Sequence, residues 1–405
     1  MSESGPEGGA GGAGILGGAG GAGGAGGAGG AGGAGGAGGA GGAGGAGGAG
    51  VARWYGGYGT VVTSDALVKH RDGIVGQWQG GLAIGQLAIE DLTLQPAHLE
   101  RWEPWVRATL FDFEALSRLQ LRRHNDIGQV NFTLYHVNAP FGGPLTHQQI
   151  ITFIRPGDAN AQFFVDQLAL VDGHADLRED RASEILAQLG PPVAFWSSVV
   201  NLHPDRTRWT LELLDMALRL ANFVEMRFKN ALAVRRPIDY SPQLQPMILT
   251  PGHGSLPSGH GTEAFMIAYV LWRLFRHVDA AKNIRWCEQL MRQAARIAIN
   301  RTVAGVHFPV DSAAGQLLGL TLGEYFVHRA LGTGTYDAVR FNGHNFVGTD
   351  DFQWRLLFDT AVNPPVRVYP VAPNPIFAER IVPQQIAGPS LYLQWLWGMA
   401  AGEWF

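Results

Sequence analysis

Residues 257–274 read PSGHGTEAFMIAYVLWRL, a Pro-Ser-Gly-His turn that leads directly into a long apolar run. Ser258 is a favourable N-cap residue, so the sequence predicts a helix over Gly259–His277. A helix N-terminus presents free N–H groups that bind anions, and Gly259 allows close approach of a ligand to the backbone. His260 lies in the first turn, where an imidazole can exchange a proton with a bound anion. Taken alone, the tetrapeptide is more simply explained as an ordinary capped helix.

A second polar segment, KNALAVRRP at residues 229–237, precedes this helix. Lys229 lies five helical turns after Leu211 and is expected to share its apolar face. Arg236 follows Lys229 by about two turns, so both cations are predicted on one side of a helix that ends before Pro237. The chain has only three lysines, which makes an inward-facing one notable. On its own, the segment is more simply a snorkelling lysine and an arginine that binds helix-terminal carbonyls.

The third segment is NRTVAGVHFPVD at residues 300–311, and its Pro309 suits the first turn of a helix predicted over Pro309–Leu331. A histidine just before a helix can meet a carboxylate four residues later. Asp311 is therefore expected to accept one ring N–H of His307 and to leave the other ring nitrogen free to attack or coordinate. A capping aspartate beside an unrelated histidine is the simpler alternative for this segment alone.

Together the segments form the pattern Lys-x6-Arg-Pro, Pro-Ser-Gly-His and Arg-x5-His-x3-Asp. They supply three cations, two histidines, a helix N-terminus and an orienting carboxylate, a set suited to a tetrahedral or trigonal-bipyramidal oxyanion. In this order they resemble the signature of the type 2 phosphatidic acid phosphatase and vanadium-dependent haloperoxidase superfamily. The resemblance covers Lys229–Asp311 directly and implies a helical core around it.

The resemblance implies a role for each matching residue. Three cations would neutralise the equatorial oxygens of phosphate or vanadate: Lys229, Arg236 and Arg301. Hydrogen bonds would be added by Ser258 and the Gly259 amide. His307 would be the nucleophile that takes a phosphoryl group or the one protein ligand of vanadium, His260 the acid/base at the opposite apex, and Asp311 the residue that holds His307. Asn300 departs from the pattern, because the family usually has serine there; asparagine can still donate a hydrogen bond.

The pocket does not separate the two chemistries of the family, because a site that stabilises a five-coordinate phosphoryl transition state also suits vanadate. The family's lipid phosphatases are membrane proteins and its bacterial acid phosphatases are short exported proteins, whereas its haloperoxidases are larger and soluble, as this chain is expected to be. His253 lies where bromide- and iodide-using members have histidine, and it is interpreted as tuning the pKa of a bound peroxide. The alternative for His253 is an ordinary loop histidine before a turn. The spacing from His260 to Arg301, in contrast, is closer to that of the phosphatases.

The resemblance favours a vanadate-dependent haloperoxidase in which vanadate, as V(V) bound to His307, acts as a Lewis acid. Its substrates would be hydrogen peroxide, a halide (bromide or iodide rather than chloride) and a small organic acceptor, and phosphate would fit the same pocket. The alternative is a soluble acid phosphatase, a phosphomonoesterase that works through a phosphohistidine at His307. A third hypothesis is a catalytically silent scaffold with a glycine-rich interaction element.

Outside the motifs, helical periodicity predicts a mainly α fold, a helical bundle with a motif core at residues 205–331 and short irregular or β segments in the N-terminal part. The other predicted helices are Ala108–Arg123, Asn160–Val171, Asp176–Leu189, Asp205–Val234 and Ala280–Asn300. Gln129–Val137 is predicted to be a strand. The proline-rich C-terminal segment is predicted to be an irregular wrap with one helix near Phe352–Thr360.

Residues 1–50 differ in composition from the rest of the 405-residue chain. They hold 29 of its 58 glycines, mostly in a Gly-Gly-Ala repeat. Because such a repeat buries no apolar area to offset the entropy of ordering it, we expect a disordered tail. Residues 51–405 are predicted to form one haloperoxidase/phosphatase-like domain.

Composition excludes several functional classes. A net charge of −4 without a long basic run argues against a nucleic-acid partner. A single cysteine, Cys287, excludes an internal disulfide and a cysteine-rich zinc site, and it is expected in the core. No apolar run is long enough for a membrane span and the start lacks a signal pattern, so a cytoplasmic protein is expected. The aromatic tail is expected to pack against the bundle or against a second copy, which leaves a homo-oligomer open; its residues are Tyr392, Trp395, Trp397, Trp404 and Phe405.

Overall fold

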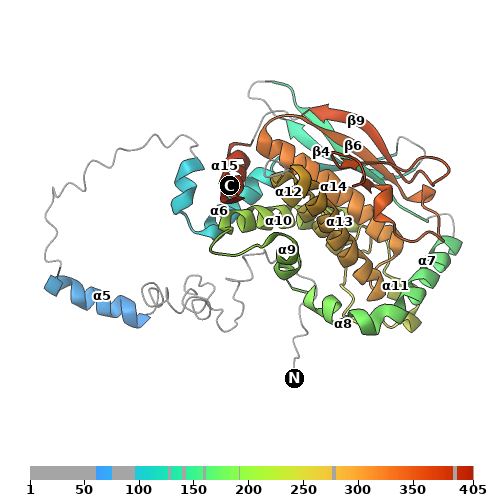
Figure 1. The fold of residues 1–405 in the computed structure, drawn as a ribbon, viewed down its shortest axis with the longest axis horizontal. Coiled ribbons are helices and arrows are strands. Elements are labelled where there is room, and N and C mark those ends of the chain that lie inside the picture. Colours follow the sequence, from blue (N-terminus) through green and yellow to red (C-terminus); the bar gives the residue numbers. More distant parts are fainter. Residues whose placement is uncertain are drawn as a thin grey trace. The chain divides into compact units, whose positions relative to one another are not determined.

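The computed structural model describes residues 61–74, 96–125, 129–138, 143–157, 161–190, 192–275, 280–385 and 390–404 (Figure 1). The glycine-rich tail predicted over residues 1–50 lies outside this part of the chain. The chain divides into two compact units. In the unit formed by residues 13–105, the described elements include α5 (Val61–Ile74) and the 3-10 helix η1 (Pro96–Arg101). The unit that includes Val106–Phe405 carries all three polar segments.

The larger unit is built around long helices that confirm the predicted bundle: α10 (Arg208–Leu232), α12 (Gly259–Leu274), α13 (Ala280–Val303) and α14 (Pro309–Leu331). Shorter helices surround them: α6 (Pro104–Leu116), α7 (Ala161–His174), α8 (Arg178–Ala187), α9 (Val193–Val200), α11 (Pro237–Tyr240) and α15 (Leu391–Ala401). The remaining 3-10 turns are η2 (Ala175–Leu177), η3 (Pro242–Leu244), η4 (Gly343–Asn345), η5 (Trp354–Leu356) and η6 (Gly402–Trp404). No helix in the described ranges is long and apolar enough to cross a membrane.

A row of glycines lets α12 and α14 pack with their backbones in contact. Gly315, Gly319 and Gly323 recur every four residues and therefore lie on one face of α14. A Cβ atom on Gly319 would lie 2.3 Å from the Thr262 carbonyl oxygen of α12, well inside van der Waals contact. Because the two helices lie this close, their N-terminal ends, which carry the Pro-Ser-Gly-His turn and Asp311, lie side by side.

One mixed sheet of five strands packs against α10 and α14 (Figure 1). Its order is β3 (Leu119–His124), β4 (Asn131–Asn138), β5 (Thr146–Ile154), β6 (Thr335–Asn342) and β9 (Ala378–Gln385). Neighbouring strands are antiparallel except β5 and β6, which are parallel. A separate two-stranded sheet pairs β7 (Phe358–Asp359) with β8 (Val366–Arg367). The Phe153 ring of β5 lies 4.7 Å from that of Phe228 on α10, so sheet and bundle share one core.

The structure corrects three predictions about these outer elements. The helix predicted over Ala108–Arg123 ends at Leu116, and Leu119–His124 instead form β3, paired with β4. The helix predicted near Phe352–Thr360 is only a short 3-10 turn followed by β7. The predicted C-terminal wrap contains the regular elements β6, β9 and α15. The strand predicted over Gln129–Val137 is confirmed as β4.

The C-terminal residues complete the bundle at the start of α10. The Glu403 carboxylate accepts hydrogen bonds from the backbone N–H groups of Trp209 and Thr210, both at 2.8 Å, and so caps the helix. The Trp395 ring of α15 packs edge-on against Trp209, with centroids 5.2 Å apart. This confirms that the described part of the aromatic tail packs on the bundle. Cys287 is fully buried in α13, as predicted.

Candidate active site

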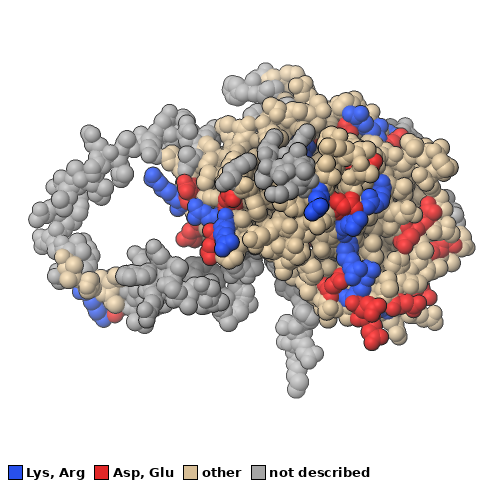
Figure 2. All heavy atoms as spheres, viewed as in Figure 1, with Lys and Arg blue, Asp and Glu red and all other residues tan. Residues whose placement is uncertain are grey.

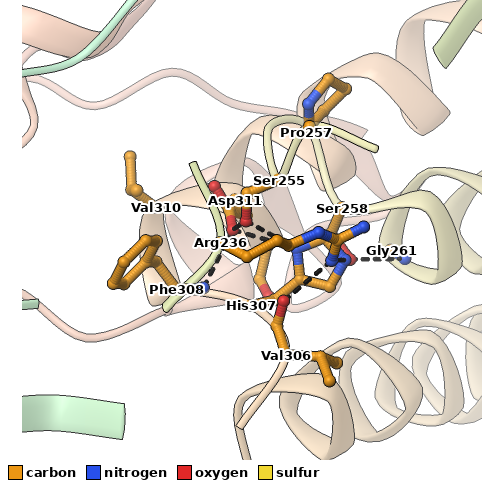
Figure 3. A network of polar contacts seen from close by, with 12 residues as sticks. Arg236, Ser255, Pro257, Ser258, Gly261, Val306, His307, Phe308, Val310 and Asp311 are labelled. Atoms are coloured by element: carbon orange, nitrogen blue, oxygen red, sulfur yellow. Dashed lines mark hydrogen bonds and ion pairs between the residues drawn. The ribbon is translucent and has the colours of Figure 1, made fainter. Parts of the chain in front are cut away.

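The N-termini of α12 and α14 are joined by a backbone hydrogen bond. The Ser258 N–H donates to the Asp311 carbonyl oxygen at 2.9 Å. The Ser258 hydroxyl accepts from the Gly261 N–H at 3.2 Å, which confirms the predicted N-cap of α12 (Figure 3). Two helix N-termini, each with partly free N–H groups, therefore meet at one buried place, which favours negative charge there.

Asp311 holds the His307 ring as the sequence predicted. His307 Nδ1 lies 3.0 Å from Asp311 Oδ2, and the same oxygen accepts the Phe308 N–H at 2.9 Å (Figure 3). It also accepts a very short hydrogen bond from the Ser255 hydroxyl. With Nδ1–H committed to Asp311, the Nε2 atom of the neutral ring keeps its lone pair. Ser255 is fully buried and was not singled out from the sequence, because it lies in a turn with no motif of its own.

Arg236 reaches the other side of the same imidazole. Its Nη1 atom lies 3.0 Å from His307 Nε2 and donates to the Val306 carbonyl at 2.8 Å, while Nε donates to the His253 carbonyl at 2.9 Å. The prediction that Arg236 and Lys229 lie on one helix is wrong. The α10 helix ends at Leu232, and Arg236 is extended, with ψ of 157°, before the short α11.

Lys229 is buried at the end of α10, but its ammonium faces a loop. Its Nζ atom donates to the backbone carbonyls of Gly254, Ser255 and Pro257, at 3.4, 3.2 and 2.5 Å. Lys229 therefore anchors the loop that leads into α12, and its positive charge lies next to that loop. Burial lowers the pKa of Lys229 to about 8.

Arg301 is the most deeply buried of the three cations, with 1% of its surface accessible. Its Nη2 atom donates to Gln188 Oε1 at 2.7 Å. Its Nε and Nη1 atoms are buried without a partner, and no carboxylate pairs with it among the described residues. Burial lowers the pKa of Arg301 only to about 10, so the cation persists at neutral pH. Two donor nitrogens without a partner, on a buried cation without a counter-ion, fit an oxyanion.

The histidines of the site are neutral at pH 7. Burial, with the nearby Arg301, lowers the pKa of His260 to about 3, and its Nε2 atom lies 3.0 Å from the Gln188 carbonyl oxygen. Burial, followed by the charges of Arg236 and Lys229, lowers the pKa of His307 well below its ordinary value. Burial lowers the pKa of His253 to about 4, and its Nδ1 atom lies 3.1 Å from Arg236 Nη2. A bound anion would oppose these positive charges and raise all three pKa values.

Gly259 leaves room for a neighbour that the sequence did not reveal. A Cβ atom at Gly259 would lie 2.5 Å from Glu225 Oε1, so the buried Glu225 carboxyl sits directly behind the turn. Burial raises the pKa of Glu225, while the charge of Lys229, one turn further along α10, opposes that rise. Glu225 could have been found only from its position four residues before Lys229 on the same helix face.

The predicted cations lie close enough to His307 for their charges to act on it, and Asn300, the departure from the family pattern, lies next to Arg301. His307 is influenced by the charges of Arg236, Lys229, His260 and Arg301. Asn300 donates to Glu184 and to Gln188, at 2.9 and 3.1 Å. The site's cations are buried, whereas on the face shown in Figure 2 basic and acidic side chains are interspersed.

Comparison with known proteins places the three polar segments within one family match. A family model described as the PAP2 superfamily matches residues 213–331, a range that contains all three polar segments. None of the curated proteins matches the chain significantly. Among solved structures, the chain is similar to a transmembrane PAP2 type phosphatidylglycerolphosphate phosphatase from Bacillus subtilis, with 19% identity and a TM-score of 0.30, over 40% of this chain and 81% of that one. An overlap this partial carries no information about the site.

Proposed function

Residues 213–331 belong to the PAP2 superfamily, and on this premise we propose that the protein is a phosphomonoesterase that works through a phosphohistidine at His307. The observation that carries the proposal is Arg301, a buried guanidinium with two unpartnered nitrogen atoms, Nε and Nη1, that can both donate. A phosphoryl group supplies the negative oxygens that these donors lack. His307 supplies a neutral imidazole whose Nε2 lone pair faces Arg236 and becomes available once the anion takes that N–H.

The first step is attack of His307 Nε2 on phosphorus, with cleavage of the ester P–O bond. Arg236 now donates towards that lone pair, so an entering phosphoryl oxygen must take over the Arg236 N–H and free the nitrogen. As Nε2 bonds to phosphorus the ring becomes positive, and the Asp311 carboxylate on Nδ1 stabilises that charge. The charge of the bound ester raises the pKa of His260, which, once protonated, gives its proton to the leaving oxygen.

The second step regenerates the enzyme. A water molecule attacks the phosphohistidine, and the now neutral His260 takes the proton that the water loses. The P–N bond breaks, inorganic phosphate leaves, and His307 Nε2 recovers its lone pair. Arg301, Arg236 and the N-terminus of α12 stabilise the equatorial oxygens in both steps.

The test uses purified protein freed of phosphate and divided in two. One part is assayed for hydrolysis of an aryl phosphate, and orthovanadate is expected to inhibit it, because vanadate mimics the five-coordinate transition state. The other part receives orthovanadate and is assayed for peroxide-dependent bromination of a dione. Bromination without any phosphate release would contradict the proposal.

A vanadate-dependent haloperoxidase is the second candidate, and the observation that favours it is His253. The side chain of His253 lies beside Arg236, so another imidazole borders the anion pocket. Vanadate is an oxyanion, and the free donors of Arg301 fit it as they fit phosphate, with Arg236 beside them and His307 as the one protein ligand. When bound, it would supply Lewis-acid activation of hydrogen peroxide. His260 would hold or move the peroxide proton, and the halide would be bromide or iodide.

Anion binding is expected to lose the contribution of Lys229 as the pH rises. Lys229→Met should weaken inhibition by inorganic phosphate by at least about tenfold near pH 6.5, because it removes a buried positive charge close to the anion site. The pKa of buried Lys229 is lowered to about 8, so the wild type loses this cation above pH 8 and the ratio of the two inhibition constants should fall towards one.

The matched control is Arg301→Met. The pKa of Arg301 is about 10, so the corresponding ratio for this variant should stay constant up to pH 9. Inhibition constants measured from pH 6 to 9 for the three proteins decide the matter. A Lys229→Met ratio that does not change over this range would show that Lys229 keeps its proton.

A further inference from the structure

A chain of hydrogen bonds runs from the surface to the buried Arg301. Arg296 pairs with Glu184 through two bonds, at 2.9 and 2.6 Å. Asn300 Nδ2 donates both to Glu184 Oε2 and to Gln188 Oε1. Gln188 Oε1 in turn accepts from Arg301 Nη2 at 2.7 Å. The chain therefore links α8, its C-cap residue Gln188 and α13.

Charge is compensated at the outer end of this chain and not at the inner end. Glu184 offsets the half-exposed Arg296. Between Glu184 and Arg301 stand two neutral amides, and within the described part of the chain the only other acceptor for Arg301 is the Ile185 carbonyl at 3.5 Å. A glutamate at position 188 would have the same length and could place a carboxylate oxygen on Arg301. The uncharged side chain thus leaves a buried cation without a counter-ion.

Gln188 also contacts His260, the proposed acid/base residue. Its backbone carbonyl lies 3.0 Å from His260 Nε2, so a neutral His260 donates that N–H to Gln188. Gln188 is 2% exposed, and its Nε2 atom is buried without a partner, as are Arg301 Nε and Nη1. One residue at the end of α8 therefore touches both the anion-binding arginine and the acid/base histidine.

We propose that Gln188 is a positioning residue that orients Arg301 without neutralising it, so that the full charge of this buried cation is kept for the phosphoryl group. The inference rests on the proposed function and deepens it. If Gln188 were only a clamp, a carboxylate would serve at least as well, because a charge-assisted bond to arginine is stronger than one to an amide.

The decisive variant is Gln188→Glu. It should fold with an unchanged or raised melting midpoint, because the new carboxylate pairs with Arg301. Its inhibition constant for inorganic phosphate should nevertheless rise by about tenfold or more at pH 7.5, the effect of one nearby opposite charge. The difference in inhibition constant between Gln188→Glu and wild type should become smaller as the pH is lowered, because the introduced carboxyl then takes up a proton.

Two further variants separate charge from shape. Gln188→Met removes the acceptor but adds no charge, so it should lower the melting midpoint and weaken phosphate inhibition less than Gln188→Glu does. Gln353→Glu adds the same charge at an exposed glutamine outside the network and should leave the inhibition constant within twofold of wild type.

Phosphate binding can also be measured without an activity assay, from the rise in melting midpoint that phosphate causes. A Gln188→Glu protein that binds phosphate as tightly as wild type would overturn the inference and leave the proposed function standing. Wild-type protein that neither hydrolyses an aryl phosphate nor is stabilised by phosphate would overturn the proposed function and this inference with it.

Discussion

Gly319→Ala is expected to destabilise the protein by at least about 3 kcal/mol, the upper end of the cost of overpacking a core. The added Cβ atom would lie 2.3 Å from the Thr262 carbonyl oxygen and 3.0 Å from the Met266 nitrogen. These are backbone atoms of α12 and cannot rotate away, so the two helices must separate. Because the same helices carry the two halves of the site, residual activity should fall together with stability.

Gly173→Ala is the matched control, since nothing lies within 4 Å of a Cβ atom at this position in α7. It should be neutral or stabilising by up to about 1 kcal/mol, because alanine is the better helix former. Urea unfolding of both variants against wild type gives the comparison. Equal midpoints for Gly319→Ala and wild type would show that α12 and α14 are not in backbone contact.

His307→Asn is expected to abolish phosphatase activity, by at least about 10⁴-fold, as removal of a nucleophile does in other covalent enzymes. The asparagine Nδ2 can occupy the place of the ring Nδ1 and keep the hydrogen bond to Asp311, which is 3.0 Å long in the wild type. What the variant lacks is an atom at the position of Nε2. It should therefore fold and still be stabilised by phosphate, yet form no acid-labile phosphoenzyme.

Ser255→Ala provides the graded comparison for His307→Asn. It removes one of the three groups that donate to Asp311 Oδ2 and leaves the nucleophile in place. A loss of about 1.5–3 kcal/mol, the value of a hydrogen bond to a charged group, is expected in transition-state stabilisation. Retention of more than a tenth of wild-type turnover by His307→Asn would place the nucleophile elsewhere.

The bundle and the motif residues could be predicted because their signals are local. Helical periodicity and caps gave the bounds of α12 and α14 closely, and the i to i+4 spacing of His307 and Asp311 anticipated their contact. The error about Arg236 has a local cause as well. Ala233 adopts a left-handed conformation, with φ of 49°, and ends α10 four residues before Pro237.

The missed features depend on contacts between distant parts of the chain. Leu119–His124 form a strand because β4 pairs with them, an interaction that no helical window in the sequence can report. Gln188 and Ser255 enter the site because α8 and the loop before α12 fold over it. Neither belongs to a spaced motif, so their residue types alone did not distinguish them from ordinary polar residues.

The parallel pairing of β5 with β6 bears on synthesis of the protein on the ribosome. Strands β3, β4 and β5 emerge first, but β6 follows only after α14, so the inner edge of β5 stays unpaired while every motif helix is made. Exposed strand edges promote association between nascent chains. We expect slowed elongation after α14 to lower the yield of monomeric protein, since it prolongs the time before β6 covers that edge.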